Sequence, residues 1–488
     1  FLVHSVPFNI HLIPRPRHMK NDALNETTHL LRPFDRKGLW STAKVILLGG
    51  AGFCADGYDL SVMNLAMAMI SEAHPGSLTP ASKGICTSLT LVGVIFGQLI
   101  FGPVADILGR KFASEMTAFL TVFGALCSAC CVNTSAWWSF AAQLSLWRFI
   151  LGVGIGGEYP ISAAMSKEGP ATVSLTRTQL LIVNIALFNV GGIMMSTFVY
   201  LSIMNNIPAA IGWRMALAGG AVPSSIAFFL RLRMEEPHVE PDLSTNAVRG
   251  VGRFGSSLRH VLLSKFRVLV FVSLAWCLFN FSAYGQSSFS ALICTTMFGQ
   301  VGESSTQRLE RDVVFALCGN AFSLLGTCFA LWLETNGMFQ RRISLFAGFS
   351  CMGALTLLSS DMWGLLPASS SWLLLSFGFL WYAAVGFMGS VTYVISAENF
   401  SSSIRATAVG VAAAVGKLGA ALGTFTFPVW VEASGLNTVL FGFGLVPLVG
   451  SLMTCLLNPL DGLQHEHPNQ IVCGASSTNG RGCKATPL

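Results

Sequence analysis

Charged residues are scarce in this sequence. Only 11% of its 488 residues are Asp, Glu, Lys or Arg, whereas a soluble globular domain carries about 25%. Hydrophobic residues make up 52% of the chain, and the mean hydropathy is +0.62. This composition excludes an ordinary soluble domain and predicts a membrane protein.

Paired cysteines and metal-binding motifs are also lacking. The 13 cysteines are scattered through apolar segments, and no CxxC pair has the second pair that a zinc site needs. We expect these cysteines to serve as small hydrophobic side chains. No nucleophile–base set, metal cluster or phosphate-cradling loop occurs in a water-exposed segment, so we expect neither an enzyme nor a cofactor.

The few charges are clumped, and long uncharged runs separate them. Since a helix crosses the hydrocarbon core with about 20 apolar residues, the longest runs are each long enough for most of two crossings. The sequence predicts an all-α, polytopic membrane protein with twelve transmembrane helices. Their expected bounds are 45–70, 84–106, 112–132, 139–165, 178–203, 209–231, 268–294, 313–334, 342–360, 364–396, 406–430 and 435–458.

Basic residues are unevenly divided between the loops. Loops on one side hold most of them, whereas 133–138, 204–208 and 431–434 hold none. Basic loops favour the cytosol, so we expect both termini to be cytosolic. The membrane that we expect to hold the protein is the plasma membrane. The net charge of +6 then reflects this bias, and we expect lipid but no nucleic acid as a partner. The side expected to be cytosolic includes Lys44, Arg110, Lys111, Arg231, Arg341 and Arg405.

The first residues resemble no leader sequence. Residues 1–18 contain prolines and basic residues without a cleavable apolar core, and Met19 is a candidate start. We therefore expect no signal peptide, with the first span acting as its own insertion signal.

The longest polar loop falls between spans six and seven and divides the chain into two halves. The halves echo each other, because YPISAAMSKE at 159–168 closes span four and YVISAENF at 393–400 closes span ten. Parallel six-helix repeats build one large class of secondary transporters, with the substrate near the midplane. The expected parts are a cytosolic segment 1–44, a six-helix half 45–231, a cytosolic loop 232–267, a second half 268–458 and a cytosolic tail 459–488.

Polar residues of four different spans fall at one expected depth. Asp56, Asn189, Asn280 and Lys417 each lie 11 or 12 residues from the cytosolic end of their span. At about 1.5 Å per residue this is about 16–18 Å, near the centre of a core about 30 Å thick. Ionisable residues at such a depth usually mark an ion or substrate path.

Two carboxylates of the first span are suited to carrying a proton. Asp56 and Asp59 lie three residues apart, on one face of a helix. Two carboxylates so near each other cannot both be ionised at low cost in a medium of low dielectric constant. Arg148, buried in span four, is a candidate partner for either. The structural alternative is an ion pair that only locks helices together.

The segment GVGIGGEYPISAAMSKE at 152–168 poses a question about its glutamate. An ionised Glu158 in an apolar segment must be paired, protonated or hydrated. Gly156 and Gly157 allow close helix approach, either for packing alone or for a site. Pro160 frees a backbone carbonyl that can accept a hydrogen bond.

The seventh span carries a polar and aromatic stripe. Trp276, Asn280 and Tyr284 are spaced four residues apart and share one helix face. Such a stripe is more often core than site, but the amide at mid-depth favours a ligand-facing role. Lys417, at the same depth, is placed to meet an anion.

Taken together, these residues resemble the major facilitator superfamily. GPVADILGRK at 102–111 is similar to the signature of its loop between helices two and three. GFCADGYDL at 52–60, RFILGVGIGGEYPISA at 148–163 and SAENFSSSIRATAVGVAAAVGKLGA at 396–420 are similar to the phosphate:proton symporter branch.

The resemblance implies roles for particular residues. Proton coupling would fall to Asp56, Asp59 and Glu158, with Arg148 as their partner. The bound phosphate would be surrounded by Tyr159, Asn189, Trp276, Asn280, Tyr284 and Lys417. The cytosolic gate would comprise Asp106, Gly109, Arg110 and Lys111.

Two departures from the family pattern bear on the substrate. This chain has Asn280 where the family has an aspartate, and Gly389 where it has an asparagine. The expected function is proton-coupled transport, with inorganic phosphate as the leading substrate. The wider pocket at Gly389 would suit an organic solute, such as a sugar or a glycerophosphodiester. A non-transporting nutrient receptor is a third hypothesis, favoured by the loss of a carboxyl group at Asn280.

Overall fold

The computed structural model describes residues 36–74, 80–132, 139–168, 175–233, 259, 265–298, 304–365, 371–401 and 404–456. All secondary structure within them is helical, which confirms the all-α prediction. The expected N-terminal segment up to residue 35, nearly all of the central loop and the C-terminal tail lie outside the described residues.

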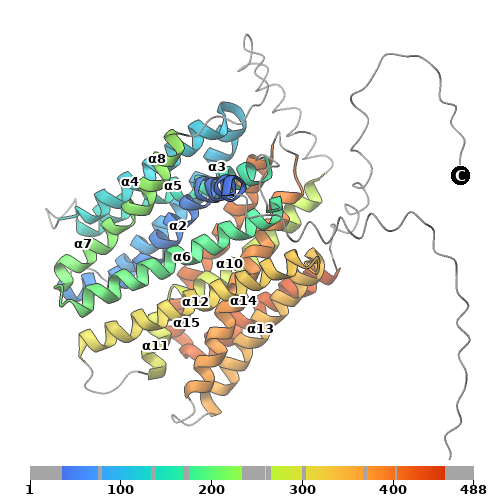
Figure 1. Ribbon diagram of the computed structural model, residues 1–488. Coiled ribbons are helices and arrows are strands. Elements are labelled where there is room, and N and C mark those ends of the chain that lie inside the picture. The colour runs from blue at the N-terminus through green and yellow to red at the C-terminus, as the bar shows by residue number, and fades with distance from the viewer. Residues whose placement is uncertain are drawn as a thin grey trace, which may run out of the picture.

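The helices lie side by side in one bundle, with the two halves of the chain largely on opposite sides (Figure 1). The first half contains α2 (Arg36–Ala73), α3 (Pro80–Leu108), α4 (Arg110–Ala129), α5 (Phe140–Glu168), α6 (Arg177–Met204), α7 (Ala209–Gly219) and α8 (Ala221–Leu232). The second half contains α10 (Phe266–Ser287), α11 (Ser290–Phe298), α12 (Ser305–Thr335), α13 (Arg341–Leu365), α14 (Ser371–Glu398) and α15 (Arg405–Leu456).

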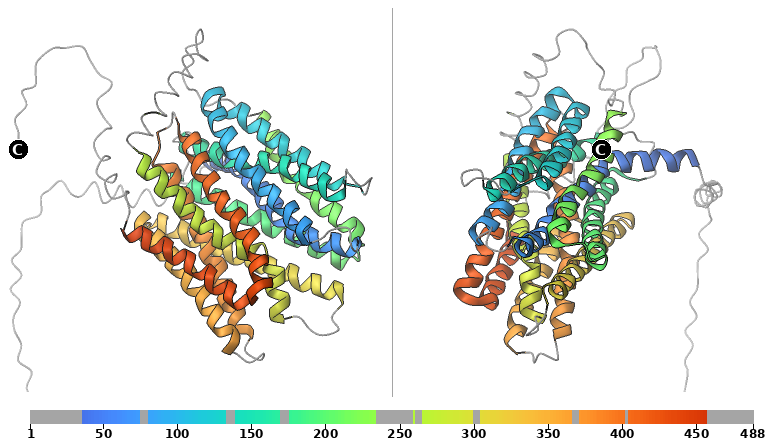
Figure 2. Two further views of the ribbon diagram at one scale, coloured as in Figure 1. Left: turned by 180° about the vertical axis from the view of Figure 1, so that it is seen from behind. Right: turned by 90° about the vertical axis from the view of Figure 1, so that its left-hand side faces the viewer.

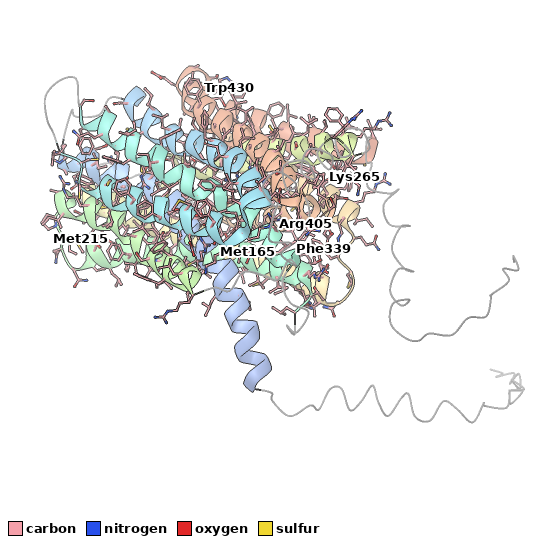
Figure 3. The ribbon with its side chains drawn as sticks, turned by 90° about the horizontal axis from the view of Figure 1, so that it is seen from above. Met165, Met215, Lys265, Phe339, Arg405 and Trp430 are labelled. Atoms are coloured by element: carbon pink, nitrogen blue, oxygen red, sulfur yellow. The ribbon has the colours of Figure 1, made fainter. Side chains whose placement is uncertain are left out.

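Eleven stretches of the described residues are long and apolar enough to cross a membrane. They match spans two to twelve of the sequence prediction. The remaining span is α2, which has Asp56 and Asp59 in its middle and packs against α6, α7 and α8 inside the bundle. The start of α2 projects away from the other helices (Figures 2 and 3). The chain is an integral, multi-pass membrane protein.

Four expected spans have irregular geometry. Span six is divided between α7 and α8 at Gly220, where the Tyr58 hydroxyl donates to the Ala216 carbonyl at 3.0 Å and Pro223 lacks an amide hydrogen. Span seven is divided between α10 and α11. Spans eleven and twelve follow each other directly under the label α15, and the chain leaves helical geometry between them at Gly435, whose φ of 79° favours glycine.

Glycines bring α3 and α5 into close contact. A Cβ atom added at Gly152 would overlap the Thr90 carbonyl oxygen and lie 3.1 Å from the Val94 amide nitrogen. Gly156 meets the carbonyl of Val94 in the same way one turn later. Small residues at such a crossing let helix backbones approach within a membrane, so packing accounts for these two glycines of the 152–168 segment.

The two halves meet along a few helices that surround the middle of the bundle. Helix α15 packs against α3 and α5, and α6 packs against α12 and α14. Apart from Arg341 at the start of α13, the polar residues of the site discussed below lie on these helices or on α2, α4, α8 and α10. The interface between halves is therefore where a ligand can be contacted from both sides.

The close crossing predicts a sharp difference between two glycine substitutions. We expect Gly152→Ala to lower the free energy of unfolding by about 1–3 kcal/mol, because the added methyl group overpacks the α3–α5 crossing. Gly378→Ala on α14 is the matched control, since no atom lies within 4 Å of the added methyl, and it should be neutral or slightly stabilising. Thermal unfolding of the purified protein in detergent measures both. Equal melting temperatures for the two variants would contradict the crossing.

Candidate functional site

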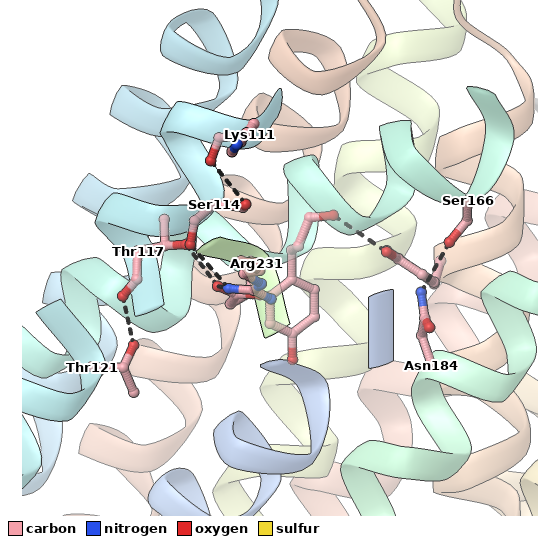
Figure 4. A network of polar contacts seen from close by, with 10 residues as sticks. Lys111, Ser114, Thr117, Thr121, Ser166, Asn184 and Arg231 are labelled. Carbon is pink, nitrogen blue, oxygen red and sulfur yellow. Dashed lines mark hydrogen bonds and ion pairs between the residues drawn. The ribbon is translucent and has the colours of Figure 1, made fainter. Parts of the chain in front are cut away.

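Glu158 on α5 is held by an arginine. Arg231 at the end of α8 donates from Nη1 to Oε1 at 2.6 Å and from Nη2 to Oε2 at 2.5 Å. Thr117 on α4 donates a third hydrogen bond, to Oε1 at 2.7 Å (Figure 4). Both charged side chains are at most 2% exposed. Glu158 is therefore paired, in the bidentate geometry that makes arginine–carboxylate pairs strong.

Arg231 is the residue of this pair whose pairing the sequence analysis did not predict. It was counted among the basic residues of the cytosolic side, but its side chain turns into the bundle and also donates to the Ser114 carbonyl at 3.1 Å. A signal existed in the sequence, because Glu158 needs a cation and Arg231 is the last residue of an expected span. Apolar composition alone does not say which way an arginine at a helix end points.

Asp59 and Arg148 form the second buried charge pair. Asp59 Oδ1 lies 4.0 Å from Arg148 Nη1, and neither side chain is exposed. Within the described part of the chain, neither side chain has a hydrogen-bond partner. Of the two carboxylates proposed for Arg148, Asp59 is the one in ion-pair range.

Asp56 is buried beside these pairs without joining either. Its side chain is 1% exposed, and neither carboxylate oxygen has a hydrogen-bond partner among the described residues. Glu158, Arg231 and Lys417 are all near enough to interact with it electrostatically. A carboxyl group in this position can change its protonation state without breaking an ion pair.

Lys417 on α15 lies among tyrosines. Its ammonium group donates to the Tyr284 hydroxyl, and its Nζ lies 5.3 Å from the centroid of the Tyr159 ring. The Tyr159 and Tyr284 side chains interact electrostatically, and Trp276 packs edge-on against Tyr159 at 6.4 Å. The structure thus brings together four of the predicted substrate residues from α5, α10 and α15.

Asn280 belongs to the same group. Its side chain is 2% exposed, and its Nδ2 has no hydrogen-bond partner among the described residues. A Cβ atom added at Gly416 would lie 3.2 Å from this Nδ2 and 2.9 Å from Cγ of Trp276. The amide therefore faces α15 at Gly416, the residue before Lys417.

Tyr393 on α14 is a residue of the site that the sequence analysis did not select. Its hydroxyl donates to the Tyr159 carbonyl at 3.2 Å, which joins the two halves. Its ring contacts Phe53 at 5.4 Å and Trp276 at 6.3 Å. We call Phe53, Tyr159, Trp276 and Tyr393 the central aromatic cluster. The signal was present, because Tyr159 and Tyr393 open the two matching motifs of the halves.

Asn189 and Gly389 contact other residues than this group. The Asn189 amide donates to the Ile185 carbonyl and to the Thr327 hydroxyl, each at 3.1 Å, and so links α6 to α12. A Cβ atom at Gly389 would meet only Ile185 and Phe279, at 3.7 and 3.9 Å. Gly389 therefore has room for one more carbon, against an apolar wall.

Asp106 joins the halves at one end of the bundle. It pairs with Arg110 at 2.7 Å and accepts hydrogen bonds from the Thr407 backbone nitrogen at 2.8 Å and hydroxyl at 2.6 Å. Gly109, with φ 102°, makes the turn between α3 and α4. Lys111 is only partly exposed at the start of α4, and its carbonyl accepts from the Ser114 hydroxyl at 3.0 Å.

A second contact between halves lies toward the same end. The Thr178 hydroxyl on α6 donates to Glu398 on α14 at 2.6 Å, and Arg341 holds the same carboxylate with two hydrogen bonds of 3.0 Å. Met165, Phe339 and Arg405 lie at this end, near the point where α2 leaves the bundle (Figure 3). The halves are therefore in contact at this end of the bundle.

A groove of about 490 Å³ lies elsewhere, along α3 and α5. Its lining is almost entirely apolar and includes Ile85, Leu89, Leu146 and Phe149. None of the buried charges described above lines it. A groove without charge has nothing to hold an anion, so we place the candidate site at the interface between halves.

Comparison with known proteins agrees with this architecture. A family model described as "Sugar (and other) transporter" matches residues 44–238 and 255–467. The solved structure of the proton:xylose symporter XylE bound to 6-bromo-6-deoxy-D-glucose superposes with a TM-score of 0.68 over 86% of this chain and 96% of that chain, at 18% identity. This likeness confirms the major facilitator fold.

Two curated relatives are similar over most of their length. Inorganic phosphate transporter 1-1 of Oryza sativa subsp. japonica is 26% identical, over 89% of this chain and 95% of the relative. Glycerophosphoinositol permease 1 of Candida albicans is also 26% identical, over 91% of this chain and 82% of the relative. Both of these relatives are transporters.

The Glu158–Arg231 pair predicts a large loss of stability when one partner is removed. We expect Arg231→Met to lower the free energy of unfolding by about 3–5 kcal/mol, because Glu158 is left as an uncompensated buried charge. The double variant with Glu158→Gln should recover part of this loss. Arg233→Met, an exposed arginine two residues away, is the control. Thermal melts of all four proteins measure the effect, and a double variant no more stable than Arg231→Met would contradict it.

The Tyr393 hydroxyl predicts a smaller effect on conformation. Tyr393→Phe removes one hydrogen bond between the halves, worth about 0.5–1.5 kcal/mol. We expect this loss to raise, about 2- to 12-fold, the population of the form in which the halves are separated at the end of the bundle that holds Asp106 and Glu398. Spin-label distances between cysteines placed at Met165 and Phe339 measure the change, with Tyr200→Phe on α6 as the control. An unchanged distance distribution would mean that the hydroxyl does not hold the halves together.

Proposed function

This chain belongs to the sugar (and other) transporter family, because the family model matches most of its length, and on this premise we propose that it carries inorganic phosphate together with protons across a membrane. Transport would follow the alternating access of a secondary transporter, in which the two halves open the central site to each side in turn.

The observation that supports an anionic substrate is the position of Lys417. Its side chain is 2% exposed, and among the described residues no carboxylate forms an ion pair with it. A buried ammonium group without a counter-charge is costly. A phosphate between Lys417, Tyr284 and the Asn280 amide would supply that charge and accept hydrogen bonds from all three.

Asp56 is best placed to carry the coupled proton. Glu158 and Asp59 each face an arginine, so a proton on either would disturb a buried pair. Asp56 has no such partner and interacts electrostatically with Lys417. Its protonation would remove one negative charge near the incoming anion and so favour binding. Release of the anion would in turn favour loss of the proton, because binding linkage is reciprocal.

The contacts at the end of the bundle would form the cytosolic gate. Asp106 with Thr407, and Glu398 with Thr178, hold the halves together there. Basic residues are concentrated on this side, which supports a cytosolic position for it and for both termini. We place the protein in the plasma membrane, with the two six-helix halves at 45–231 and 268–458 moving about the site.

A second candidate function is proton-coupled transport of a glycerophosphodiester. The similarity to the glycerophosphoinositol permease is as high as that to the phosphate transporter. Space for an added carbon at Gly389 also favours a substrate with an organic group. Competition of radiolabelled phosphate uptake by glycerophosphodiesters distinguishes the two, and binding without flux would support a receptor instead.

Uptake into proteoliposomes tests the phosphate–proton assignment. We expect phosphate to accumulate when the interior is made alkaline. Asp56→Asn should abolish accumulation driven by the pH gradient but retain exchange of internal for external phosphate, because the amide mimics the permanently protonated carboxyl group. Asp361→Asn, at an exposed position on α13, should behave like the unmodified protein. Accumulation by Asp56→Asn that still follows the pH gradient would exclude Asp56 as the proton carrier.

A further inference from the structure

We propose that Asn280 makes this site accept tetrahedral oxyanions that carry no acidic hydrogen, with sulfate as the simplest example, alongside phosphate. The inference rests on the proposed function, because it concerns the ligand of the same site. It assigns Asn280 as the residue that determines which oxyanions bind.

The first step is the unused hydrogen-bond donor. Asn280 is almost completely buried, yet its Nδ2 has no partner among the described residues. An unsatisfied buried donor costs about 1–3 kcal/mol, which a ligand oxygen would recover. The donor lies against Gly416, one residue before Lys417, and one helical turn from Tyr284. An oxyanion held by Lys417 is therefore within reach of this amide.

The second step is the state of the neighbouring carboxylates. Both Glu158 oxygens are occupied by Arg231. Asp59 faces Arg148, and Arg148, not Lys417, is the charged group that interacts with it. Asp56 remains, and in the proposed cycle it holds the proton when the anion binds. The loaded site then offers the anion hydrogen-bond donors and neutral oxygens but no free carboxylate.

The third step is how a site distinguishes phosphate from sulfate. Phosphate keeps at least one P–OH group near neutral pH, whereas sulfate has none. A carboxylate acceptor binds the P–OH hydrogen of phosphate and repels sulfate, which is discrimination by an unfavourable contact. The amide of Asn280 donates as well as accepts, and it carries no charge. A site lined in this way has little means of rejecting sulfate.

Competition in proteoliposomes tests this inference. Uptake of radiolabelled phosphate is measured with increasing sulfate, and chloride at matched ionic strength is the reference. We expect sulfate to inhibit with a half-maximal concentration within about tenfold of that at which phosphate half-saturates. In Asn280→Asp we expect sulfate inhibition to weaken by at least about tenfold while phosphate uptake persists. This factor corresponds to about 1.4 kcal/mol.

Further variants keep the test decisive if the aspartate variant is inactive. Asn280→Ser keeps a neutral donor and should remain sensitive to sulfate, and Asn205→Asp on the exposed end of α6 should match the unmodified protein. Phosphate uptake that is unaffected by a hundredfold excess of sulfate would overturn the inference and leave the proposed function standing. Equal inhibition of the unmodified protein and an active Asn280→Asp would overturn the role of Asn280. Absence of any phosphate uptake by the unmodified protein would instead reject the proposed function.

Discussion

The ion pair between Glu158 and Arg231 is the interaction on which the rest of the site depends. A carboxylate in a membrane interior is costly unless it is paired and hydrogen-bonded. Here the guanidinium and the Thr117 hydroxyl satisfy both oxygens. The pair also joins the end of α8 to the middle of α5. One pair therefore removes an electrostatic penalty and fixes the helix that carries Tyr159 into the site.

Pairing of some charges leaves others available for chemistry. Arg231 and Arg148 each face one carboxylate, which accounts for two of the three acidic residues near the centre. Asp56 and Lys417 remain, one from each half, and they interact electrostatically without forming an ion pair among the described residues. A site with one unpaired carboxylate and one unpaired ammonium group can take up a proton and an anion together at little net change in buried charge. Coupled transport of a proton and an anion requires this balance of charge.

The sequence predicted much of this because depth in a membrane follows from counting residues along a helix. Asp56, Asn280 and Lys417 were placed at one level in this way, and all three lie at the interface of the halves. Counting residues gives the depth of a side chain but not its direction around the helix axis. It could therefore not show that the Asn189 side chain turns to Thr327 on α12. It also does not show where the side chain of a residue at a helix end points, which is why Arg231 was counted only among the basic residues of the cytosolic side. Composition gave no reason to select Tyr393.

The internal repeat explains why Tyr393 belongs to the site. Tyr159 and Tyr393 stand at matching positions of the two halves, so a pseudo-symmetric arrangement brings them to the same place from opposite sides. Their rings meet at 6.3 Å, and the Tyr393 hydroxyl bonds to the backbone that carries Tyr159. Tyr159 also interacts electrostatically with Tyr284, to which Lys417 donates a hydrogen bond. These tyrosines thus join the candidate site to the contact between the halves.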